Sequence, residues 1–281
     1  MSSNPSSSSV PRRTVVSGLL AGAAFTATAC SSASTPPAPP PTTTAPPPSN
    51  PTGPDGASAT AAVHASTPAT SATPAVLTTP GADIRSGPAT VPRAALTFHG
   101  AGDLTLAHAA LDLLAARGAR VTVFAVGSWL AATPSIGREI VAAGHALGNH
   151  TWSHPTLTHL GLAAATDEVR RGADAVAAAV GTAGALFRPS GTPSSTATIR
   201  AAALAAGYAR SISYDLDSLD YTDPGAAAVV ATVTAALHPG AIISLHLGHR
   251  HTIAALPRIL DALAGAQLQP VTVPDLLHGV A

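Results

Sequence analysis

The chain has 281 residues, a formal net charge of zero, and 10% charged against 46% hydrophobic residues. This composition is enough for one sizeable core, and the zero net charge argues against nucleic acid and against a polybasic membrane patch as binding features. Lysine is absent, whereas twelve histidines stand beside fourteen acidic residues. Histidine is the commonest metal ligand and a ready acid or base near neutral pH.

Residues 1–30 have the pattern of a bacterial signal peptide. Arg12 and Arg13 precede an apolar stretch over residues 14–29, which is shorter than the about 20 residues that span a bilayer. The arginine pair indicates twin-arginine export. Cys30, the only cysteine, follows Ala-Thr-Ala and resembles the lipidated cysteine of bacterial lipoproteins. We therefore expect an anchor at the outer face of the cell membrane; the alternative is an ordinary cleavage site followed by a free thiol.

Residues 31–92 are rich in proline, threonine, serine and alanine. Such a segment has few side chains that could build a core, so we expect a disordered spacer. The remaining residues, 93–281, are expected to form the single folded domain.

Apolar segments alternate with helical ones through this domain. The expected strands are residues 94–98, 120–126, 146–150, 185–190, 208–216, 241–247 and 268–273. The expected helices are residues 104–118, 134–144, 166–181, 195–207, 224–237 and 251–266. About seven such repeats predict an α/β fold of parallel strands joined by helical crossovers. The pattern alone leaves open whether the strands form a closed barrel or an open sheet.

Polar side chains gather just after the ends of the expected strands, where parallel strands present one common face. In chain order they are His99, Asp103, His150, His154, Arg188, Asp215, Asp217, Asp220, His246 and His249. This concentration predicts a functional site on that face.

The pair His150 and His154 is the sharpest signal. A spacing of four on a helical turn would put both rings on one side, and two neutral imidazoles so placed are two-thirds of the protein ligands of a divalent metal site. Asp103, on a glycine-rich turn, could bend inward as a third ligand and leave a position open for water. The alternative is a helix start with two solvated histidines.

The order of motifs resembles the NodB-like polysaccharide deacetylases, whose signature runs TFDDG, HxxxH, an RxPYG-like stretch, DxxDW and LxH. This chain offers ALTFHGAGD, NHTWSH, FRPSG, DSLDY and SLH over residues 93–280. The resemblance implies a distorted, incomplete (β/α) barrel that uses a metal ion to remove acetyl groups from N-acetylated sugars.

The first motif departs from the family, because His99 and Gly100 stand where the family has two aspartates, a base and a metal ligand. We expect Asp103 to replace the ligand and His99 to replace the base. In the alternative assignment, His99 is the third ligand and Asp103 the base.

The later motifs imply further roles. Arg188 keeps the family's position and is expected to orient an acidic or polar partner in catalysis. His246 matches the family's acid, and Asp220 matches the aspartate that tunes it. Trp129 and Trp152 are candidates for stacking on sugar rings, whereas His249 and His251 have no assigned role.

These residues lead to one expected activity. A monomeric, Zn²⁺-dependent enzyme would deacetylate an N-acetylated glycan, with cell-wall peptidoglycan first and chitin-like oligomers second. A non-catalytic glycan-binding lipoprotein that keeps the fold is the main alternative. A metal amidase acting on a non-sugar N-acyl group is another.

Overall fold

The computed structural model describes residues 80–278. The expected signal peptide, Cys30 and residues 31–79 of the expected spacer lie outside the described residues. Within residues 80–278, no helix combines the length and the apolar character that crossing a membrane requires.

The strands form one parallel sheet with β1 at its centre. In sheet order they are β3 (Ala146–Asn149), β2 (Thr122–Ala125), β1 (Arg93–Gly100), β5 (Ile242–His246) and β4 (Leu216–Asp217), and β6 (Gln269–Pro270) pairs with the start of β1. Parallel neighbours require crossover connections, and helices supply most of them. The predicted alternation is therefore confirmed.

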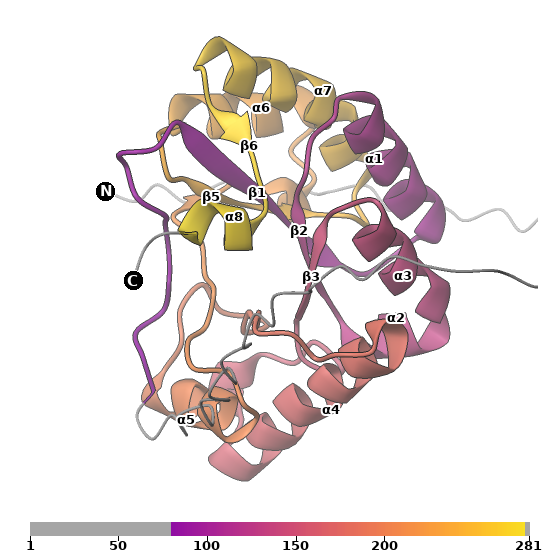
Figure 1. Ribbon diagram of the computed structural model, residues 1–281, viewed down its shortest axis with the longest axis vertical. Coiled ribbons are helices and arrows are strands. Elements are labelled where there is room, and N and C mark those ends of the chain that lie inside the picture. The colour runs from indigo at the N-terminus through magenta and orange to yellow at the C-terminus, as the bar shows by residue number, and fades with distance from the viewer. Residues whose placement is uncertain (1–79, 279–281) are drawn as a thin grey trace, which may run out of the picture. The chain divides into compact units, whose positions relative to one another are not determined.

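The helices lie around the outside of the strands (Figure 1). They are α1 (Leu104–Ala116), α2 (Gly127–Ala132), α3 (Pro134–Ala142), α4 (Leu162–Val180), α5 (Ala197–Ala205), α6 (Ala226–Ala235), α7 (Arg250–Gly265) and α8 (Val273–Leu277). Two short 3₁₀ turns, η1 (Leu157–His159) and η2 (Asp220–Thr222), complete the described elements. Gly181 ends α4 with φ +85°, the left-handed conformation that glycine adopts most easily.

Two of the expected strands are reduced to little more than single bridges, which makes the barrel distorted. Residues 185–190 pair with β3 through one bridge, Asn149 to Phe187, and Pro189 has no N–H with which to extend that pairing. The second of these expected strands, residues 208–216, continues the barrel. The N–H of Ile212 donates to the carbonyl of Phe187 at 2.8 Å, and β4 then pairs with β5. The distorted (β/α) barrel implied by the family resemblance is confirmed.

Residues 80–92 belong to the folded domain, which corrects the expected spacer boundary at residue 92. Ile84 forms a parallel β-bridge with Ile212. Its side chain packs against the apolar cluster to which Ile212 belongs. A carboxylate oxygen of Asp83 accepts the N–H of Ser195 at 2.6 Å. A proline- and glycine-containing segment can thus be ordered by backbone pairing, which composition does not reveal.

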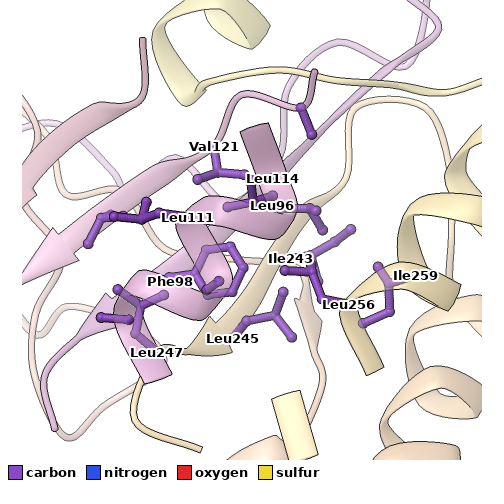
Figure 2. Close-up of a cluster of buried hydrophobic side chains, with 14 of the residues drawn as sticks. Leu96, Phe98, Leu111, Leu114, Val121, Ile243, Leu245, Leu247, Leu256 and Ile259 are labelled. Atoms are coloured by element: carbon purple, nitrogen blue, oxygen red, sulfur yellow. The ribbon is translucent and has the colours of Figure 1, made fainter. Parts of the chain in front are cut away.

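The alternation of side chains along β1 determines which residues reach the site. Leu96 and Phe98 point outward into the main core, where they meet side chains of α1, β5 and α7 (Figure 2). Thr97 lies on the opposite face and is fully buried. His99 follows on that same inner face, at the end of the strand.

Candidate active site

Three histidines converge where β1 and β3 end. His99, His150 and His154 each offer one ring nitrogen, and these atoms lie within 4.8 Å of one another. The ring centroids of His99 and His150 are 4.4 Å apart, and those of His150 and His154 are 4.8 Å apart. Among the histidine, cysteine and acidic side chains of residues 80–278, these three form the group that is close enough together to hold a metal ion.

The HxxxH segment is a tight loop, so the expected helical turn is wrong. Thr151 and His154 have φ values of +67° and +59°, in a left-handed region that non-glycine residues seldom occupy. The side-chain carbonyl of Asn149 accepts the N–H of Thr151 at 2.8 Å, an interaction that competes with helix formation. The two rings meet because the loop reverses direction, and helical periodicity has no part in it.

His150 is the most deeply placed of the three, with no exposed surface. Its Nδ1 lies 2.9 Å from the backbone carbonyl of Arg188. Because a carbonyl can only accept, this hydrogen bond puts the proton on Nδ1 and leaves a lone pair on Nε2. That Nε2 is buried and has no hydrogen-bond partner. A carbonyl behind one ring nitrogen and a bare second nitrogen are the usual arrangement of a metal-ligating histidine.

The protonation state of the cluster suits a metal. Burial lowers the pKa of His99 and of His150 well below the ordinary histidine value, and the neighbouring imidazoles lower both further. The hydrogen bond to the backbone carbonyl of Arg188 opposes part of the pKa shift of His150. Burial also lowers the pKa of His154. Neutral imidazole is the form that binds metal ions, so the three side chains fit a divalent cation of the zinc class.

Asp103 does not join the histidines, contrary to the expectation that it would be the third ligand. It is exposed and caps α1, with its Oδ1 accepting the N–H of Thr105 at 2.7 Å. An aspartate placed just before an apolar periodic segment is a helix-start signal, and that signal was available in the sequence. His99 occupies the third position, as in the alternative assignment.

A second unit of the site joins His246, at the end of β5, to Asp220 in η2. The Nδ1 of His246 lies 2.7 Å from Oδ1 of Asp220, while Oδ2 accepts the N–H of His246 at 2.8 Å and the hydroxyl of Thr252 at 2.5 Å. Burial by itself raises the pKa of Asp220, but the hydrogen bonds from His246 and Thr252 outweigh it and lower that pKa. The expected pairing is therefore found, and Thr252 is a supporting residue that no sequence motif indicated.

Arg188 lies inside the barrel and does not orient an acidic partner. It is 1% exposed, and its guanidinium donates to Oγ1 of Thr97 at 2.8 Å and to the carbonyls of Ile212 and Ser213 at 3.1 and 2.9 Å. Burial lowers its pKa to about 9, so it stays charged at neutral pH. Its side chain links β1 to the segment that contains Ile212 and Ser213, and its carbonyl orients His150.

A cavity opens beside the two units. It has a volume of about 470 Å³ and adjoins a smaller one of about 230 Å³. His99, His154, His246 and His249 line both. The larger cavity also has Tyr214 and Tyr221 in its wall.

The aromatic side chains of this cavity are tyrosines and not the expected tryptophans. Trp129 donates from its ring to the carbonyl of Gly102 at 3.0 Å, and Trp152 carries Arg171 over its ring at 4.4 Å. Tyr221 is 49% exposed and its ring centroid lies 5.5 Å from that of His246. The family's DxxDW position, occupied here by Tyr221, was the signal for it.

Comparison with known proteins agrees with this geometry. A family model described as polysaccharide deacetylase matches residues 86–210. A family 4 carbohydrate esterase from Streptomyces lividans, solved in complex with acetate, is 34% identical, with a TM-score of 0.58 over 63% of this chain and 91% of that one. This chain belongs to the polysaccharide deacetylase family.

Two curated members of the family show what its proteins are named for. A peptidoglycan-N-acetylglucosamine deacetylase from Bacillus cereus is 30% identical over 66% of this chain and 87% of its own length. A chitooligosaccharide deacetylase from Bradyrhizobium sp. is 35% identical over 50% of this chain. The alignment spans 63% of the Bradyrhizobium protein.

The departure in the first family motif is built into the strand. A Cβ at Gly100 would lie 2.8 Å from Cγ1 of Val123 and 3.1 Å from Cα of Ala125. An aspartate at this position therefore requires the Val123 side chain and the backbone at Ala125 to shift.

Proposed function

We propose that this chain is a metal-dependent hydrolase that removes N-acetyl groups from an amino-sugar polymer. The observation that carries the proposal is the buried, unpartnered Nε2 of His150 among the ring nitrogens of His99 and His154. The chain's membership in a family named for deacetylation supports the reaction. Three neutral histidines with an open cavity beside them support a catalytic zinc ion.

Each residue has a distinct part in the reaction. His99, His150 and His154 would hold the ion, which would supply Lewis acidity and lower the pKa of a bound water toward neutrality. Asp220 binds Nδ1 of His246 and directs Nε2 of that ring to the cavity. His246 would accept the proton that the attacking water loses and would deliver it to the departing amine as the C–N bond breaks. Acetate and a free amino sugar leave the cavity.

A non-catalytic glycan-binding protein is the second candidate. The loss of both family carboxylates favours it, because His99 is drawn into the cluster and Asp103 is committed to capping α1. The cavity, with Tyr221 at its edge, would still accept a sugar ring.

The substrate and the location are parts of the same proposal. The names of the relatives support N-acetylglucosamine polymers, with peptidoglycan first and chitin-like oligomers second. A lipid on Cys30, reached through the twin-arginine route, would anchor the chain to the outer face of the cell membrane. Peptidoglycan is the N-acetylated polymer nearest to that location.

A zinc titration combined with a product assay tests the proposal. The purified chain is stripped with a chelator, reloaded with zinc, and incubated with N-acetylated chito-oligosaccharides and with peptidoglycan fragments. We expect bound zinc, acetate release, and the mass loss of one acetyl group per sugar by mass spectrometry. The variant His154→Ala, which keeps two of the three histidines, should bind zinc far more weakly and release no acetate.

A matched control keeps this test specific. His108 is an exposed histidine of α1 that contacts Glu139, so His108→Ala should retain both zinc binding and acetate release. A native chain that binds zinc and glycan without releasing acetate would favour the second candidate. A native chain that binds no zinc would overturn the metal site.

A further inference from the structure

The loop that carries His154 holds an unfavourable backbone conformation. Thr151 and His154 are both left-handed at φ +67° and +59°, and neither is glycine. Such residues cost about 1–3 kcal/mol each and persist only where their surroundings hold them. Some part of the molecule must therefore fix the loop.

The carboxylate of Glu168 makes the required contacts. One of its oxygens accepts the N–H of Trp152 at 3.1 Å and that of Ser153 at 2.9 Å. The other accepts the hydroxyl of Ser153 at 2.8 Å. Hydrogen bonds to a charged acceptor are stronger than neutral ones, and these three fix the two residues directly before His154.

The same face of α4 holds the beginning of the loop. The amide of Asn149 donates to the carbonyl of Val169 at 2.8 Å, while its oxygen accepts the N–H of Thr151. A Cβ at Gly172 would lie 2.2 Å from Oδ1 of Asn149 and 2.8 Å from the carbonyl carbon of Thr151. Helix and loop are therefore in contact along a full turn of α4, and glycine is needed where they meet.

We propose that Glu168 is a positioning residue for the metal site, acting through the loop to present His154. The proposal rests on the proposed metal site. Every contact of Glu168 described above is to Trp152 or Ser153, and neither residue belongs to the histidine cluster. Glu168 therefore acts on the loop that carries His154 and lies outside the histidine cluster.

The test compares Glu168→Ala and Glu168→Gln with Asp167→Asn. Asp167 is the preceding residue of α4, is exposed, and lies 3.7 Å from Arg171, so it is a matched control. Zinc affinity is measured by competition with a chromophoric chelator at a temperature where every metal-free variant is folded. We expect Glu168→Ala to bind zinc about 10–100-fold more weakly, the range for residues that support a ligand. Glu168→Gln, which keeps an acceptor, should fall between Ala and native, and Asp167→Asn should match native.

Two further measurements separate positioning from general stability. In a His154→Ala background, Glu168→Ala should cause no additional loss of residual zinc affinity, because the residue acts through His154. In the metal-free chain, hydrogen exchange at the amides of Trp152 and Ser153 should accelerate in Glu168→Ala and stay unchanged in Asp167→Asn.

The outcomes distinguish this inference from the proposed function. If the native chain binds zinc and Glu168→Ala binds it equally well, Glu168 has no positioning role and the metal site stands. Full additivity with His154→Ala would likewise overturn the role. If the native chain binds no zinc, both the metal site and the role assigned to Glu168 fail.

Discussion

The two sides of the site place histidine in different surroundings. On the β1 and β3 side, His99, His150 and His154 are packed together with no carboxylate in their group. On the β5 side, His246 is bound by the fully buried carboxylate of Asp220 at 2.7 Å. The His246 ring is nevertheless only 4.3 Å, centroid to centroid, from that of His99.

The difference shows how an environment assigns a role to an imidazole. Burial beside other imidazoles disfavours the protonated ring, so the first side offers neutral ligands. A carboxylate on Nδ1 fixes the tautomer and the direction of the second nitrogen, so the other side offers an oriented nitrogen that can take up and return a proton. Variants that affect one side and spare the other test this division.

The largest expected effect is on the rate. His246→Ala should lower kcat for acetate release by about 10²–10⁴-fold, the usual contribution of a general acid or base, and should leave zinc affinity unchanged. Steady-state kinetics on chito-oligosaccharides and zinc competition on the same samples measure both. His249→Ala is the control, because His249 lines the same cavity but contacts the exposed Asp223; it should retain most of the rate. Loss of zinc binding in His246→Ala would mean that the two sides are one unit.

The next effect is on stability. Asp220→Asn should lower the free energy of unfolding at pH 7 by about 3 kcal/mol, because a buried charged acceptor of three hydrogen bonds is replaced. Since the folded-state pKa of Asp220 is lowered, the stabilisation by its charge is fully present above the ordinary aspartate value of about 3.9. It is lost as the pH falls through the folded pKa.

Urea unfolding of native and variant chains across this range measures that effect. The difference between them should be constant from pH 7 to about 5 and should shrink below about 4. Asp217→Asn serves as the control, since Asp217 accepts one N–H, from Leu219 at 3.1 Å, and should change stability by less than about 1 kcal/mol. Equal stability of native and Asp220→Asn at pH 7 would contradict the pairing as a stabilising contact.

The smallest expected effect concerns Asp103. Asp103→Ala removes the cap of α1 and should cost about 1 kcal/mol of stability, while zinc affinity and acetate release stay at native levels. Asp103→Asn, which preserves a capping oxygen, should be closer to native in stability. A large fall in zinc affinity in either variant would restore Asp103 as a ligand and break the carboxylate-free description of the first side.

Sequence patterns predicted the parts of the molecule that depend on local spacing. Alternating strands and helices predicted the parallel sheet, and the positions of His99, His150, His154 and His246 after strand ends predicted that they would share one face. Pattern reasoning did not predict the left-handed loop before His154, because its stability comes from Glu168 and Gly172 on α4. It also predicted Asp103 to be a metal ligand, although the local helix-start signal favoured a cap of α1.

The sequence by itself determined the family, the order of the strands along the chain, and which residues stand near the strand ends. Tertiary structure alone decided that residues 80–92 pair with the barrel and that His99 completes the histidine cluster. It also decided that the guanidinium of Arg188 binds Thr97 and the carbonyls of Ile212 and Ser213. The physical reason is the distance along the chain over which each interaction acts. Periodicity and capping act over a few residues, whereas a buried charge, a left-handed backbone or an unpartnered ring nitrogen depends on segments that meet only after the chain has folded.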